Sequence, residues 1–144
     1  MGNICSKSKS IKHRDYKLNW YKEAQTIATH LTDEESYSSI MSSGKFIPSS
    51  SGWNGPGLYA HIGDVRNGEG KGKHKILFDY SDLKISDGEK PIEFSQERWD
   101  KLRTKDNRTI DKELVNLGYD GEIMHGGTYI RIFPESVGKI SPIK

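Results

Sequence analysis

The sequence contains a single cysteine, Cys5, so no disulfide bond can form within the chain. It has no apolar run approaching the roughly 20 residues that a membrane-spanning helix needs. Its start also lacks the apolar segment of a secretory signal peptide, and no Gly-x-x-x-x-Gly-Lys-Ser/Thr phosphate-binding loop occurs. These absences argue against a disulfide-stapled domain, a bilayer-spanning helix and a P-loop nucleotide hydrolase. The single cysteine fits a protein of a reducing compartment.

The sequence also shows no group of residues spaced as metal ligands. The residues around His61 and His125 show no ligand set at the spacing of known metal sites, and Cys5 lies far from both in the sequence. We therefore expect no metal cofactor.

Positive charge is concentrated at the start of the chain. Residues 1–17 hold five basic residues against Asp15 alone, whereas the remainder holds 17 basic and 19 acidic residues. Residues 1–17 thus carry a net charge of +4 and the rest of the chain, its body, a net charge of −2, which together give the net charge of +2. The slightly acidic body argues against a nucleic-acid partner, which needs a basic face. The basic tail fits an anionic membrane surface.

The 144 residues suffice for one ordinary domain but hardly for two. Residues 1–16 are rich in Ser and Lys and poor in apolar side chains, which predicts a disordered tail. Residues 17–144 contain most of the 3 Trp, 7 Tyr and 4 Phe, and they predict a single domain with a modest core.

The first six residues match the pattern for N-myristoylation, with Gly2 exposed once Met1 is removed and a hydroxyl residue at Ser6. One myristoyl chain binds a membrane only marginally, with an association constant of about 10⁴ M⁻¹. Palmitoylation of Cys5, or attraction of the basic tail to anionic lipids, would supply a second anchor. The alternative is a soluble leader whose lysines are simply hydrated. We expect attachment to the cytoplasmic face of a membrane, the plasma membrane in particular.

The opening Met-Gly-Asn-Ile-Cys also resembles the start of several effectors that plant-pathogenic bacteria inject into host cells, where the host acylates them. The resemblance covers only these few residues. For a bacterial chain it implies secretion into a eukaryotic host, because bacteria are expected to lack the myristoylating enzyme.

The domain's apolar pattern predicts an α+β fold, because short strands are grouped rather than strictly alternating with helices. Gly126-Gly127 is the expected turn of a closing hairpin. In the first helix, Thr32 is the expected N-cap, since Glu35 three residues later completes a capping box, and Gly44 is the expected C-cap. The expected strands are 25–31, 58–62, 74–80, 121–124 and 128–133, and the later helices are 96–103 and 110–117.

Two blocks of residues carry a family resemblance. The first is Thr-His-Leu-Thr at 29–32, followed by a helix that ends at Gly44 and by Gly-Pro-Gly-Leu-Tyr-Ala at 55–60. The second is Leu-Gly-Tyr-Asp-Gly at 117–121 with Thr-Tyr-Ile-Arg-Ile-Phe-Pro at 128–134. Together they resemble the diphtheria-toxin-like and PARP-like ADP-ribosyltransferases over roughly residues 25–140. The resemblance implies that family's split β-sheet core with flanking helices.

The resemblance also implies NAD as donor substrate and a protein as acceptor. His30 would donate to a ribose hydroxyl, the backbone of Leu31 would pair with the nicotinamide amide, and Thr32 would add a hydroxyl. Tyr59 would stack on the nicotinamide ring, and Gly57 would allow a close approach of the backbone.

One position departs from the family pattern. Polymerising members have a Glu before the late Tyr-apolar run, where this chain has Thr128. Loss of that Glu resembles the mono-transferring members, or members without catalysis. Glu122 on the neighbouring strand is a candidate substitute, and it completes the expected catalytic set with His30 and Tyr59. Its alternative role is that of a solvated surface residue.

Each of these residues also has a purely structural interpretation. A lone His on a strand is more often structural than catalytic, Thr32 is explained as a helix cap, and Tyr59 as ordinary packing. Their order and spacing together favour a membrane-tethered mono-ADP-ribosyltransferase acting on a protein. The alternatives are a catalytically inactive module of this fold at the membrane, and an NAD glycohydrolase with water as acceptor.

Overall fold

The computed structural model describes residues 26–52, 54–65 and 74–144. The predicted tail at 1–16, with both lipidation residues Gly2 and Cys5, lies outside these ranges.

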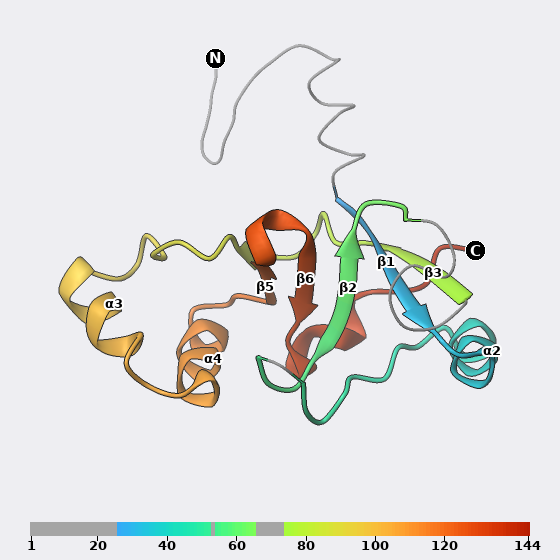
Figure 1. Cartoon of the computed structure of the whole chain (residues 1–144), viewed down its shortest axis with the longest axis horizontal. Coiled ribbons are helices and arrows are strands. Elements are labelled where there is room, and N and C mark those ends of the chain that lie inside the picture. Colours follow the sequence, from blue (N-terminus) through green and yellow to red (C-terminus); the bar gives the residue numbers. More distant parts are fainter. Residues whose placement is uncertain (1–25, 53, 66–73) are drawn as a thin grey trace, which may run out of the picture.

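The chain forms an α+β fold around one six-stranded mixed sheet with strand order β3-β1-β2-β6-β5-β4 (Figure 1). Neighbouring strands are antiparallel except for β4, which runs parallel to β5. All six strands are hydrogen-bonded into one continuous sheet, whereas the family resemblance implied a split one. The strands are β1 (Ile27–Thr32), β2 (Leu58–Ile62), β3 (His74–Asp79), β4 (Ile85–Ser86), β5 (Gly121–Met124) and β6 (Tyr129–Ile132).

Helices lie at both ends of the sheet (Figure 1). At one end α2 (Glu34–Ser43) contacts β3, and at the other end lie α3 (Gln96–Leu102) and α4 (Asn107–Asn116). The 3-10 turn η1 (His125–Gly127) joins β5 to β6, and η2 (Pro134–Lys139) follows β6. Among the described residues, no helix combines the length and apolar character that crossing a bilayer requires.

The first helix starts one residue later than its predicted cap implied. Asp33 is the N-cap, because its Oδ1 accepts a hydrogen bond of 2.7 Å from the backbone N–H of Ser36. Thr32 is the last residue of β1, so the predicted capping role of Thr32 is wrong. Gly44 ends the helix with φ of 74°, which confirms the predicted C-cap.

Apolar side chains on one face of the sheet form the main core. Alternation along the strands buries residues such as Ala28, Ala60 and Ile130 on that face, where Ile40 of α2 and Val137 of η2 cover them. A second cluster joins α3 and α4 to the end of β6 through Phe94, Leu102, Leu114 and Phe133.

The opposite face of the sheet carries a polar row. Tyr59 on β2 is the register partner of Arg131 on β6, and Arg131 is the register partner of Glu122 on β5. Because directly paired residues point to the same face, these three side chains rise together from the sheet.

Candidate functional site

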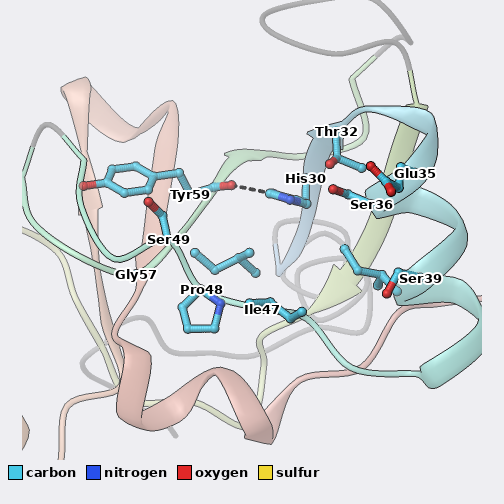
Figure 2. A pocket seen from close by; sticks show the side chains of 12 residues that line it. His30, Thr32, Glu35, Ser36, Ser39, Ile47, Pro48, Ser49, Gly57 and Tyr59 are labelled. Carbon is cyan, nitrogen blue, oxygen red and sulfur yellow. Dashed lines mark hydrogen bonds between the residues drawn. The ribbon is translucent and has the colours of Figure 1, made fainter.

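A cleft of about 590 Å³ opens between β1, α2 and the segment that precedes β2 (Figure 2). This volume lies within the range of ordinary small-molecule sites. Two apolar residues, Ile47 and Pro48, form one wall, and Ile47 keeps 73% of its surface exposed there. The polar residues that line the cleft are His30, Thr32, Glu35, Ser36, Ser39, Ser49 and Tyr59.

His30 is fixed in one tautomer by its neighbour on β2. Its Nδ1 lies 2.9 Å from the backbone carbonyl oxygen of Tyr59, and a carbonyl oxygen only accepts, so Nδ1 carries the proton (Figure 2). Burial lowers the pKa of His30, and the hydrogen bond to Tyr59 opposes this only in part. The ring is therefore neutral at pH 7 and leaves Nε2 as an acceptor. His30 can thus accept from a ligand hydroxyl, whereas we expected it to donate.

Packing holds the imidazole of His30 in place. The ring of Phe46 meets it edge-on, with ring centroids 5.8 Å apart and an interplanar angle of 85°. Phe46 is itself buried in the main core, where it contacts Phe78. The acceptor nitrogen is therefore carried on a side chain with little rotational freedom.

The junction of β1 and α2 supplies the second polar wall. Thr32 ends β1, and Glu35 and Ser36 lie in the first turn of α2, on the same side of the cleft as His30 (Figure 2). Since Asp33 caps the helix, neither the Thr32 hydroxyl nor the Glu35 carboxylate is hydrogen-bonded within the described part of the chain. The sequence interpretation used Glu35 only as a capping residue. No pattern in the sequence marked Glu35 as a residue of the cleft, because the capping interpretation already accounted for it.

Leu31 and Gly57 have clear structural roles. Leu31 pairs with Lys75 on β3 and is not among the residues that line the cleft. Gly57 does line it, with φ of 151°, and a Cβ atom there would lie 2.5 Å from the carbonyl oxygen of Ile132. The close approach that requires glycine at position 57 is therefore to β6.

The ring of Tyr59 points away from His30, although its carbonyl faces it (Figure 2). Its Oη donates to the carbonyl oxygen of Gly55 at 2.6 Å and accepts from the backbone N–H of Asn54 at 3.0 Å. Gly52 packs against the ring so closely that a Cβ atom would lie 2.7 Å from it. The ring thus supports Gly52 and the loop at 54–57, in contrast to the stacking role expected from the family resemblance.

Glu122 lies at a separate hollow of about 230 Å³, which Asp111 and Arg131 also line. Its Oε2 accepts from Nε and Nη2 of Arg131 at 3.0 and 2.7 Å. β2 and β6 separate its strand, β5, from β1 in the sheet. The structure brings His30, Thr32 and the backbone at 57–59 together, but it does not bring Glu122 to them.

Arg131 is the centre of this hollow and only 1% of its surface is exposed. All five of its N–H bonds are used: two go to Glu122, two to Asp111 at 2.7 and 2.8 Å, and one to the carbonyl oxygen of Pro56 at 2.9 Å. The guanidinium also lies over the ring of Phe133. These contacts tie α4, β5 and the loop at 54–57 to β6.

Comparison of the chain with family models, with curated proteins and with solved structures finds no match. Function is therefore inferred from the chemistry of the cleft together with the resemblance in the sequence. Within the described residues, no three His, Cys, Asp or Glu side chains gather as a metal-binding group.

Proposed function

We propose that the chain is a membrane-tethered mono-ADP-ribosyltransferase that binds NAD in the cleft between β1 and α2 and modifies a protein. The observation that carries this proposal is His30, which lines the cleft and whose Nδ1–H donates to the Tyr59 carbonyl oxygen, so that the neutral ring keeps Nε2 as an acceptor. A ribose offers hydroxyl donors to such an acceptor. The hydroxyls of Thr32, Ser36 and Ser39 add donors and acceptors of the kind that a sugar uses.

Transfer of ADP-ribose depends more on how the site positions the substrate and stabilises charge than on a reactive side chain. Breaking the bond between the ribose and nicotinamide passes through an oxocarbenium-like state, so a site that holds the ribose rigidly contributes much of the rate. A locked imidazole and the main chain of β1 supply rigidity of this kind. Attachment of the tail to a membrane through Gly2 and Cys5 would raise the effective concentration of a membrane-bound target.

A catalytically inactive module of the same fold is the second candidate. It is favoured by one observation, namely that the Glu122 carboxylate is engaged by Arg131 in a hollow other than the His30 cleft. Such a module would bind NAD or a related ligand at the membrane without turnover.

The test uses the full chain with labelled NAD and a eukaryotic membrane fraction as acceptor source. It compares His30→Ala with His61→Ala, because His61 packs against Tyr129 and does not line the cleft. We expect label on a protein band with the wild type and with His61→Ala, and loss of label with His30→Ala.

The other outcomes separate the remaining candidates. Binding of NAD without turnover would favour the inactive module, and release of nicotinamide without labelled protein would indicate a glycohydrolase. Absence of NAD binding by the wild type would refute the assignment.

A further inference from the structure

The charged side chains among the described lining residues of the cleft are all negative. Glu35 carries the only carboxylate among its lining residues, and no Lys or Arg lines it in the part of the chain that the structure describes. His30 is neutral for the reasons given above. The described lining of the cleft therefore carries one negative charge, which repels phosphate groups and attracts a cation.

NAD has two ends that differ in charge. Its oxidised nicotinamide ring carries a positive charge, whereas its diphosphate is anionic and is usually bound by basic side chains or helix N-termini. The first turn of α2 lines the cleft, but the Asp33 carboxylate already caps that helix end by accepting from the backbone N–H of Ser36. With no basic side chain among its described lining, the cleft therefore suits the first group better than the second.

We propose that Glu35 is a specificity-determining residue that recognises the positive charge of the nicotinamide ring, so that the cleft takes the nicotinamide riboside end of NAD and leaves the diphosphate outside. This inference rests on the proposed function and deepens it.

The position of Glu35 favours this role over that of a surface charge. It belongs to the first turn of α2, which the Asp33 cap holds against the end of β1. Figure 2 shows its carboxylate beside Thr32, on the wall that also carries Ser36 and His30. No ion pair or hydrogen bond with a described residue competes for this carboxylate.

The chain offers a matched control one residue away. Glu34 lies in the same turn of α2 and is likewise exposed, but it does not line the cleft. Both glutamates interact alike with the positive end of the helix dipole, so Glu34→Gln and Glu35→Gln should lower helix stability similarly. Any difference in ligand binding then arises in the cleft.

The experiment measures dissociation constants of the full chain for NAD⁺ and NADH by titration calorimetry. NADH keeps the diphosphate but has a neutral nicotinamide ring. We expect the wild type and Glu34→Gln to prefer NAD⁺ by about three- to tenfold, as for one partly exposed charge contact. Glu35→Gln should lose this preference. High salt should shrink it in the wild type.

Two further ligands locate the diphosphate. Nicotinamide riboside, a cation without phosphate, should compete with NAD⁺ for the wild type, and ADP-ribose, which lacks the nicotinamide ring, should compete poorly.

Failure of this inference is distinct from failure of the proposed function. Equal affinity of the wild type for NAD⁺ and NADH, or an unchanged preference in Glu35→Gln, overturns the role of Glu35 while NAD⁺ binding that depends on His30 still stands. Absence of NAD⁺ binding overturns both. Melting temperatures of the two variants verify that they are equally folded.

Discussion

Tyr59 and Arg131 are register partners on β2 and β6, and their side chains hold the same loop from one face of the sheet. Tyr59 Oη donates to the carbonyl oxygen of Gly55, and Arg131 Nη1 donates to that of the next residue, Pro56. This loop leads into Gly57 at the wall of the cleft. The position of that wall is therefore set by residues whose side chains lie on the far face of the sheet from His30.

Replacement of Arg131 by Ala should lower the free energy of unfolding by about 3–5 kcal/mol, because it leaves two half-buried carboxylates without their counter-charge. Denaturation in urea measures this loss. Arg98→Ala is the control, since the Arg98–Glu113 pair is largely exposed and should contribute at most about 1 kcal/mol. Similar losses in the two variants would contradict the central role of Arg131.

Protonation of His30 should couple stability to pH. Its folded-state pKa is lowered from 6.5 by burial, so the unfolded chain takes up a proton first as the pH falls. This contribution is complete above pH 6.5 and decreases below it, by at most about 1.4 kcal/mol per pH unit. Urea denaturation between pH 7.5 and 5 measures the slope. The slope should be smaller in His30→Gln, and an equal slope in both proteins would show that His30 is not the responsible group.

Gly57 and Gly44 should differ sharply in their tolerance of a side chain. Gly44→Ala meets no atom within 4 Å and should cost about 1 kcal/mol from its φ of 74° alone. Gly57→Ala adds a collision with the carbonyl oxygen of Ile132, and we expect a loss of about 2–5 kcal/mol. Thermal melting compares the two, and equal melting temperatures would refute the close approach to β6.

Tyr59→Phe should loosen the loop at 54–57 without changing the volume of the cleft. The variant loses the hydrogen bonds to Gly55 and Asn54, worth about 1–2 kcal/mol together. Amide hydrogen exchange should therefore become faster at Asn54 and Gly55. Unchanged exchange there, with weaker NAD binding, would instead favour the stacking role that the sequence suggested for Tyr59.

Expression in eukaryotic cells tests the predicted tether. Gly2→Ala should abolish incorporation of a myristate analogue and move the protein from the membrane to the soluble fraction. Cys5→Ser should retain myristate and weaken membrane association in part, because one acyl chain binds only marginally. A Gly2→Ala protein that remains on the membrane would contradict the acylation hypothesis.

Much of the fold follows from local sequence patterns. The strand at 58–62 and the closing hairpin around Gly126-Gly127 were predicted and are confirmed, as are α3 and α4 to within three residues. β4 was missed because its two residues, Ile85 and Ser86, carry no periodicity of their own and depend on pairing with β5. The cap at Asp33 was missed because Thr32 and Asp33 are both good caps, and pairing of Thr32 with His74 decides between them.

The site was less predictable than the fold, because it depends on the directions in which side chains point. The sequence predicted His30 near the end of a strand, where it lies, but it predicted Thr32 as a helix cap just after that strand, whereas Thr32 is its last residue. It did not reveal on which face of β2 the Tyr59 ring would stand, because that depends on its pairing with Arg131. The association of Asp111 with Arg131 links residues 20 positions apart, and no short-range pattern indicates it.

The two glycines beside β6 limit which substitutions the sequence can accept. A Cβ atom at Gly57 would collide with the carbonyl oxygen of Ile132, and one at Gly121 would collide with the carbonyl oxygen of Arg131. On both sides of β6 the neighbouring backbone therefore lies too close for a side chain. A side chain at either position would force the two strands apart, so glycine is favoured at both wherever this sheet is kept. A glycine just before β2, a glycine opening β5 and an arginine inside β6 are thus the signature by which diverged relatives should be recognisable.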